Sequence, residues 1–155
     1  MANANDCPCG SGRPYAACCE PFHAGGEPPD AVALMRTRYA AFVRCEHDYL
    51  FRTLHPQHDD HALGVRALRE RLEKNAKRTR YHALAILDDA PPDADGVARV
   101  LFSATVKHDG KDASFVELSS FVHDGTGWRY LTGKTLPPRG LGELSRLRIA
   151  DVERV

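Results

Sequence analysis

The stretch ARVLFSATVK, residues 98–107, lies between two turn-forming pairs, Asp95-Gly96 and Asp109-Gly110. Its β-branched and apolar residues predict a strand, and the Asp-Gly pairs at both ends predict antiparallel hairpins with neighbouring strands. Three further strands are expected on the same grounds, at residues 81–87, 113–122 and 127–131. The second half of the chain is therefore predicted to form an antiparallel sheet.

The residues that precede this sheet follow helical patterns. Asp30 is a suitable N-cap for a helix that extends to about Cys45 and carries apolar side chains at three- and four-residue spacing. A short helix at 47–54 is expected to stop before His55-Pro56, because a residue that precedes proline disfavours helical backbone. A third helix is expected at 61–77. Helices followed by strands, without alternation, predict an α+β fold with helices packed on one face of a curved sheet.

The composition excludes several classes of protein. The chain has 155 residues, with 21 Lys and Arg against 21 Asp and Glu, so a dedicated nucleic-acid binder is not expected. The basic stretch 66–80 is interpreted as a solvated helix face, with an RNA or acidic-protein contact as the alternative. No apolar run approaches the roughly 20 residues of a membrane-spanning helix, so no membrane partner is expected. The first six residues lack the features of a signal peptide, which favours a cytoplasmic location.

A small N-terminal module is expected before the main domain. Residues 25–29, GGEPP, form a cluster of residues that break regular structure. We therefore predict a metal-binding motif and linker at 1–29 and one α+β domain at 30–155. From Pro137 onward, a loop followed by either a short helix or a short strand is expected, and the sequence does not distinguish between the two.

Four of the five cysteines fall within CPCGSGRPYAACC, residues 7–19. In a reducing compartment, thiols this crowded predict a zinc site rather than disulfides. The predicted ligands of one structural Zn²⁺ are Cys7, Cys9, Cys18 and Cys19. Four protein ligands fill a tetrahedral site, so no coordination position is left for water or substrate.

Several alternatives to this assignment stay open in the sequence. His23 is a rival to Cys19 for the fourth position, and oxidation of two or four of the thiols would make the cluster a redox switch. Cys45, late in the first helix, is interpreted as a small core side chain rather than a ligand. A second metal site on a helix is the alternative to a hydrophilic loop for His55, His58 and His61.

The cysteine run resembles the SEC-C motif, a C-x-C-x8-C-[CH] zinc knuckle found at the C-terminus of the bacterial preprotein translocase ATPase. A second resemblance, to the YchJ family, rests on LMRTRYAAFV at 34–43 and on Asp48-Tyr49-Leu50, Thr53, His55-Pro56, Glu117, Ser119 and Phe121. It covers the chain to about Gly133. It implies an N-terminal SEC-C motif followed by a domain similar to nuclear transport factor 2, whose sheet forms a cone with an open mouth. Many family members carry a second SEC-C motif at the C-terminus, whereas residues 141–155 contain no cysteine.

The resemblance also implies where a pocket would lie. Relatives with this cone use its interior as an isomerase-type active site, a dehydratase pocket or a binding cleft. Isomerase chemistry needs a carboxylate base and a group that stabilises an enolate. The candidate pocket residues are Arg36, Tyr39, His55, His82 and Glu117. An ion pair of Glu117 with Arg36 or Arg38 is the structural alternative.

These observations lead to two hypotheses of function. The first is a non-enzymatic, cytoplasmic zinc-binding adaptor, because the SEC-C knuckle of the translocase is a docking surface for the export chaperone and the ribosome. The partner would then be a protein, and a homodimer is also considered. The alternative is a small-molecule-binding or isomerase-like protein that uses the cone around Glu117. An adaptor predicts an exposed knuckle beside a pocket filled by side chains, whereas the alternative predicts an open cavity that includes Glu117.

Overall fold

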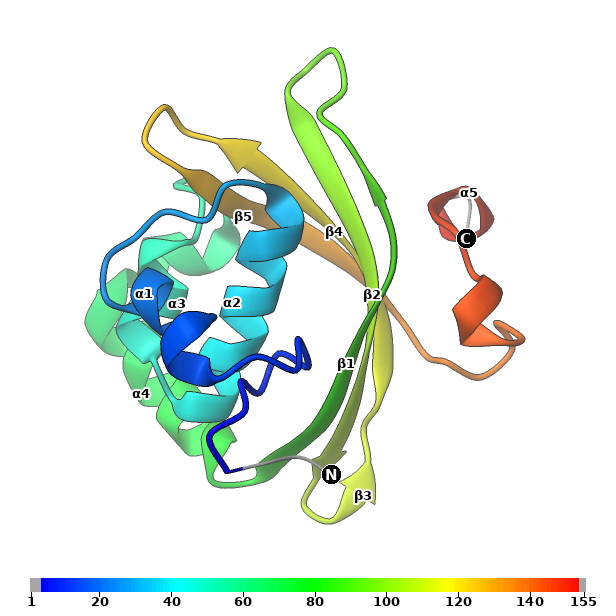
Figure 1. Cartoon of the computed structure of the whole chain (residues 1–155), viewed down its shortest axis with the longest axis horizontal. Coiled ribbons are helices and arrows are strands. Elements are labelled where there is room, and N and C mark those ends of the chain that lie inside the picture. Colours follow the sequence, from blue (N-terminus) through cyan, green and yellow to red (C-terminus); the bar gives the residue numbers. More distant parts are fainter. Residues whose placement is uncertain (1–3, 154–155) are drawn as a thin grey trace.

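The computed structural model of the protein describes residues 4–153. Helices of the N-terminal half pack on one side of a sheet formed by the C-terminal half (Figure 1). This arrangement confirms the α+β prediction. The longer elements are α2 (Ala31–Arg44), α3 (His47–Arg52), α4 (Gly64–Ala76), β1 (Thr79–Ala90), β2 (Val97–His108), β4 (Phe115–His123) and β5 (Trp128–Leu136). The shorter ones are η1 (Tyr15–Ala17), α1 (Glu20–His23), η2 (Asp59–Leu63), β3 (Lys111–Asp112), η3 (Leu144–Arg146) and α5 (Ile149–Val152).

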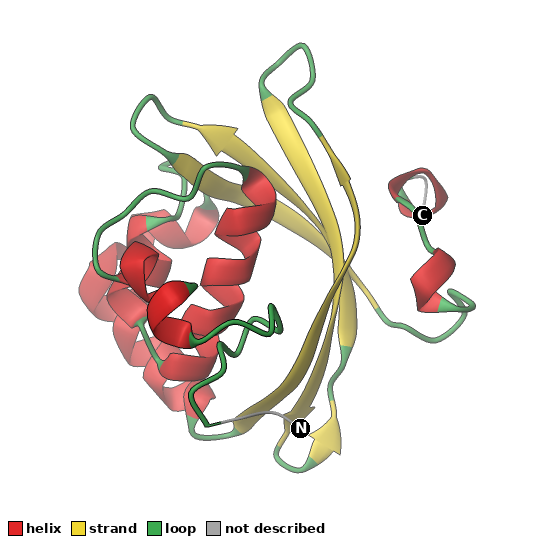
Figure 2. Ribbon diagram, in the orientation of Figure 1, coloured by secondary structure: helices red, strands yellow, loops and turns green. Residues whose placement is uncertain are grey.

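The sheet is antiparallel, with strand order β1-β2-β4-β5, and the short β3 pairs with β2. The hairpin glycines Gly96, Gly110 and Gly125 all have positive φ, which explains the Asp-Gly pairs of the sequence. Register shifts interrupt β1 after Tyr81 and after Ile86. Such bulges bend a strand, and the sheet curves around the helices without closing into a barrel (Figure 2).

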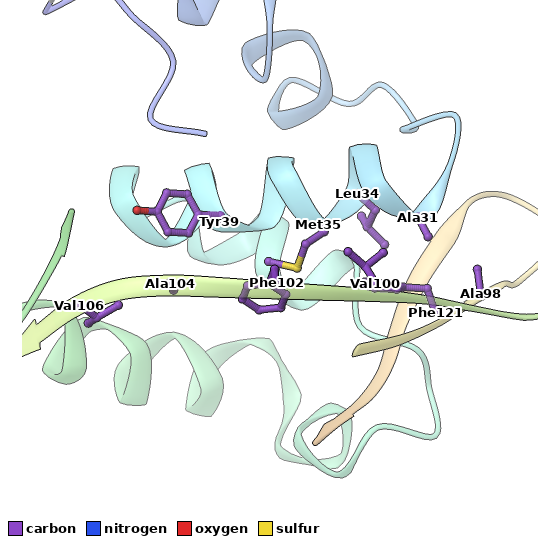
Figure 3. Close-up of a cluster of buried hydrophobic side chains, with 10 residues drawn as sticks. All are labelled: Ala31, Leu34, Met35, Tyr39, Ala98, Val100, Phe102, Ala104, Val106 and Phe121. Atoms are coloured by element: carbon purple, nitrogen blue, oxygen red, sulfur yellow. The ribbon is translucent and has the colours of Figure 1, made fainter. Parts of the chain in front are cut away.

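The main core lies between α2 and the concave face of the sheet. Alternate residues of β2 point towards the helix, as strand geometry requires. Figure 3 shows side chains of α2 facing these β2 positions. The buried members of this cluster are Ala31, Leu34, Met35, Tyr39, Ala98, Val100, Phe102, Ala104, Val106 and Phe121.

The C-terminal segment covers the opposite, outer face of the sheet (Figure 1). Leu101 of β2 points to this side and packs with Ile149 and Val152 in a second buried cluster. The segment is anchored by polar contacts as well, since the Ile149 N–H donates to Asp88 Oδ2 at 2.9 Å and Arg99 pairs with Glu153 at 3.0 Å. The segment that the sequence left undecided is therefore two short helical turns that build an outer core.

Two expectations for the helical half need correction. The third helix begins at Gly64 rather than at residue 61, because Gly64 has φ +82°, which interrupts the helical path after η2. Cys45 is exposed and is not a core residue. It adopts the left-handed conformation that ends α2, with φ 60°, and this turns the chain away from the core. Among the residues that the structure describes, none of the helices combines the length and hydropathy needed to cross a membrane.

Candidate metal centre and domain cavity

The four cysteines of the N-terminal run converge at one point. Their sulfur atoms all lie within 4.8 Å of one another, with Cys9 Sγ 3.6 Å and Cys19 Sγ 4.0 Å from Cys18 Sγ. The intervening loop folds back because the Cys7 N–H donates to the Arg13 carbonyl at 2.8 Å and because Gly10 and Gly12 take positive φ. In the described part of the chain, this is the one group of His, Cys, Asp and Glu side chains that could hold a metal ion.

The geometry of the cluster fits zinc. Four thiolates around Zn²⁺, each with a Zn–S distance of about 2.3 Å, place their sulfur atoms about 3.8 Å apart in a tetrahedron. The distances from Cys18 Sγ to Cys9 Sγ and Cys19 Sγ, 3.6 Å and 4.0 Å, bracket that value. Soft sulfur donors favour zinc over Mg²⁺ or Ca²⁺, which prefer oxygen ligands. The residues present therefore fit a closed, four-thiolate zinc site, in which the bound metal would act as a structural cross-link.

The thiols also interact among themselves. A hydrogen bond from Cys19 lowers the pKa of Cys9 to about 4 and raises the pKa of Cys19. Burial raises the pKa of Cys7. One thiolate in the cluster is thus stabilised by its neighbours, and a divalent cation would extend that stabilisation to all four.

His23 lies outside the ligand group and has a different role. Its Nε2 donates to the Thr37 carbonyl at 2.8 Å, which leaves Nδ1 as the acceptor for the Tyr15 hydroxyl at 2.7 Å. Both ring nitrogens are therefore used, and the neutral tautomer joins the N-terminal module to α2. Burial lowers the pKa of His23, which keeps the ring neutral.

The cysteine knuckle, residues 5–21, is packed against the domain rather than extended from it. Cys7, Cys9 and Cys19 are only 4%, 0% and 2% exposed, and they pack against the fully buried Ala40 of α2. Arg36 Nη1, on the same helix, donates to the Cys9 carbonyl at 3.0 Å. The metal-binding loop is thus built onto the back of the central helix.

The concave side of the sheet contains a cavity of about 350 Å³. Its lining residues come from α2, the end of α4, strands β1, β2, β4 and β5, and the loop between β3 and β4. Aromatic rings dominate the wall, from Tyr39, Phe42, Tyr81, Phe102, Phe115 and Tyr130. The remaining lining residues are Met35, Ala104, Val106 and Ala113, with Arg38, Asn75, Thr79, His108 and Glu117 as the polar groups.

Glu117 is held by hydroxyl groups of its own sheet. Tyr130 donates to Glu117 Oε2 at 2.8 Å, Ser119 donates to the same oxygen, and Thr135 donates to Oε1 at 3.2 Å. Gly133 allows this arrangement, because a side chain there would overlap the Glu117 carboxylate and the Tyr130 hydroxyl. The carboxylate is therefore fixed in orientation at the wall of the cavity.

Arg38 is the second charged group of the cavity, and it is 6% exposed. Its Nη1 donates to the Leu50 carbonyl at 2.9 Å and to Thr53 Oγ1 at 2.6 Å. Its guanidinium carbon lies 4.8 Å from the centre of the Tyr130 ring, a cation–π distance. No ion pair joins Arg36 or Arg38 to a carboxylate of the described residues, so the structural alternative of a pairing with Glu117 is not formed.

The structure brings two of the five predicted pocket residues, Tyr39 and Glu117, into one cavity. Arg36 points to the knuckle instead. His55 Nδ1 accepts from the Gln57 N–H at 3.1 Å in the loop after α3. His82 is exposed because it follows the cavity-facing Tyr81, and neighbouring strand residues face opposite sides.

Sequence reasoning missed Arg38 and Tyr130 as cavity residues. Arg38 lies three residues after Met35 and directly before Tyr39, so it falls on the edge of the apolar stripe, a signal that was present. Tyr130 belongs to a strand whose start the sequence predicts, yet its partners Arg38 and Glu117 are far away in the sequence. The second metal site considered for His55, His58 and His61 is absent from the described residues, where His58 packs on Tyr130 and His61 stacks on Phe51.

Comparison with protein families agrees with this architecture. Residues 5–21 match the SEC-C motif, and residues 30–133 match the family described as YchJ, middle NTF2-like domain. The second match spans more than half of the chain. The chain belongs to the YchJ family. The resemblance stated from the sequence is thereby confirmed, and so is the NTF2-like, curved and open sheet.

Two solved structures are similar to this YchJ-family chain. A SEC-C motif containing protein from Psychrobacter arcticus is 28% identical, with a TM-score of 0.66, over 81% of this chain and 80% of that one. A SEC-C motif containing protein from Rhodopseudomonas palustris is 27% identical, with a TM-score of 0.68, over 84% of this chain and 98% of that one. The combination of knuckle and curved sheet therefore recurs in related chains.

Metal content tests the cysteine site directly. We expect about one zinc ion per chain, by elemental analysis, in protein purified without chelator, since four thiolates complete the shell. Cys18→Ser should lose most of the metal, whereas Cys45→Ser, which changes an exposed cysteine outside the group, should retain it. Reduced and folded wild-type protein without zinc would contradict the assignment.

The His23 contacts predict a pH dependence. The unfolded chain takes up a proton at a pKa near 6.5, whereas burial keeps the folded ring neutral to lower pH, so stability falls as the pH drops through about 6.5. His23→Phe should lower the free energy of unfolding by about 2 kcal/mol at pH 7.5, through two lost hydrogen bonds, and should flatten this pH dependence. Urea unfolding of wild-type protein and of His23→Phe at a series of pH values measures this dependence. Protonation of the cysteines affects both alike, so parallel pH profiles would contradict the role of His23.

Proposed function

We propose that this YchJ-family protein is a zinc-stabilised binding protein for a small organic molecule. The observation that supports ligand binding is the cavity of about 350 Å³, which lies open on the concave side of the sheet and includes Glu117. Its volume and its aromatic lining with few polar groups are typical of small-molecule sites. A protein that used this face only as a core would fill it with side chains.

Zinc has a structural role in this proposal. Four cysteines complete its coordination, so the bound metal offers no position for a substrate. Three of the four are buried against Ala40, so a metal held by these cysteines would lie behind the helix that lines the cavity. Reduced thiols are required for this site, which supports a cytoplasmic location. We propose binding rather than catalysis as the primary role of the domain.

A matched pair of substitutions tests the cavity. Ala104 lines it and is 2% exposed, whereas its neighbour Thr105 is exposed on the outer face of the same strand. We expect quinoline, a flat apolar probe, to bind wild-type protein and Thr105→Leu with similar affinity in calorimetric titrations. Ala104→Leu should weaken binding at least roughly tenfold, because the added side chain occupies the cavity. Absence of quinoline binding to wild-type protein, or equal binding to both variants, would contradict the proposal.

An adaptor role is the second candidate, and one feature of the knuckle favours it. The loop Gly10–Arg13 is exposed, although the cysteines around it are buried. A metal-fixed loop of this kind presents a constant surface to a partner protein, as rigid scaffolds do for binding loops. The adaptor would use this outer surface, and the cavity would be independent of it.

Photo-crosslinking separates the adaptor role from a purely structural knuckle. A photoreactive residue replaces Arg13 in the exposed loop or, as the control, Thr105, which is exposed on the opposite, outer face of the sheet. In cell extract, an adaptor predicts a discrete crosslinked protein from position 13 that is not obtained from position 105. The same product from both positions, or none from position 13, would speak against the adaptor.

A further inference from the structure

The Arg38 guanidinium has hydrogen-bond donors that the protein does not use. Both hydrogen bonds of the guanidinium, to the Leu50 carbonyl and to Thr53 Oγ1, are donated by Nη1. Nε and Nη2 have no partner among the described residues. No fully buried side-chain nitrogen or oxygen of the described chain lacks a partner, so these donors must border open space. The cavity is that space, because Arg38 lines it. These unused N–H groups, at an otherwise apolar wall, are suited to donate to an acceptor atom of a ligand, such as a carbonyl oxygen.

The Glu117 carboxylate supplies the complementary acceptor. Two oxygens offer about four lone-pair sites, and three hydroxyl donors occupy three of them. Oε1 accepts only from Thr135 and therefore keeps capacity for a further donor. Because Glu117 lines the cavity, this remaining capacity is the acceptor that we assign to an N–H or O–H group of a ligand.

Tyr130 holds these two groups next to each other. Arg38 lies over the face of its ring, at 4.8 Å, and Glu117 accepts from its hydroxyl, at 2.8 Å. Both charged groups of the cavity therefore contact the same tyrosine, one at the face of its ring and one at its hydroxyl. A ligand with an acceptor and a donor on one edge can form hydrogen bonds with Arg38 and Glu117 at the same time. Amide side chains recognise the edges of nucleic-acid bases in the same way.

The charges of the two groups favour a neutral ligand. Arg38 and Glu117 carry opposite charges at the same wall, so their fields largely cancel in the cavity. An anion bound at Arg38 would meet the carboxylate, and a cation bound at Glu117 would meet the guanidinium, each at a cost in a site of low dielectric constant.

The aromatic walls of the cavity favour a ligand that contains a flat ring. Tyr39 and Tyr81 meet edge to face at 5.8 Å between ring centres, and Phe102 and Phe115 do so at 5.9 Å. Aromatic faces and edges pack well against planar rings. At about 30 Å³ for each water-sized unit, 350 Å³ accommodates roughly a dozen non-hydrogen atoms, the size of one fused ring pair.

We propose that the cavity binds a neutral, planar cyclic lactam, with the ring carbonyl accepting from Arg38 and the ring N–H donating to Glu117. The ligand class is a heteroaromatic or fused bicyclic ring with this carbonyl and N–H edge. The inference rests on the proposed small-molecule function and adds the identity of the recognised edge.

A series of four probes tests this edge by calorimetric titration of the zinc-containing full chain. 2-Quinolone has the complete edge, N-methyl-2-quinolone lacks the donor, and quinoline lacks the carbonyl. 2-Naphthoate presents a carboxylate on a similar body. We expect 2-quinolone to bind on the order of tenfold to a hundredfold more tightly than the other three, since each lost contact involves a charged partner.

Glu117→Gln identifies the residue responsible. The amide retains the size of the side chain but turns a donor towards the ligand N–H, so the preference for 2-quinolone over its N-methyl analogue should disappear. Quinoline, which has no N–H group, should still bind this variant, which shows that the cavity is intact. Thr105→Leu, on the outer face, should retain the wild-type preference.

The outcomes separate the two proposals. If quinoline and 2-quinolone bind equally, or if the preference survives in Glu117→Gln, the lactam inference is wrong while the cavity remains a ligand site. If 2-naphthoate binds most tightly, the ligand is an anion and the inference of a neutral ligand is wrong. If no probe binds, the proposed function itself fails.

Discussion

Helix α2 buries side chains around most of its circumference, and the other elements are arranged to cover it. Leu34 and Met35 pack on the sheet, Ala40 lies under the cysteine knuckle, and Ala41 packs with α3. Alanines at 40 and 41 let neighbouring backbone approach closely. A helix covered on several sides needs layers from different parts of the chain, so the knuckle, α3 and the sheet all depend on one another through α2.

Arg38 is the exception on this helix. A guanidinium that is 6% exposed loses much of its hydration, and burial lowers its pKa. The Leu50 carbonyl, Thr53 and the Tyr130 ring compensate for part of that cost, but no carboxylate pairs with it directly. A charge retained in this position, with unused donors at a cavity wall, is explained more simply by ligand recognition than by folding stability.

The metal site and the cavity share the same helix. Arg36 contacts the backbone of the knuckle, and Arg38, about half a turn further on, lines the cavity. Zinc would therefore fix the back of the helix whose front shapes the binding site. This link gives the SEC-C motif a physical role in this chain that requires no exposed partner surface.

The sequence by itself determined the order of helices and strands, the hairpin positions and the cysteine group, because periodicity, Asp-Gly turns and crowded thiols act over short distances. It did not determine the C-terminal segment, whose helical turns form only against Leu101 and its neighbours on the outer face. It also did not distinguish Cys19 from His23 as a candidate ligand, or Arg38 from Arg36 as a cavity residue. Only the tertiary structure decided these, because they depend on which face of α2 meets the knuckle and which meets Tyr130 and Glu117.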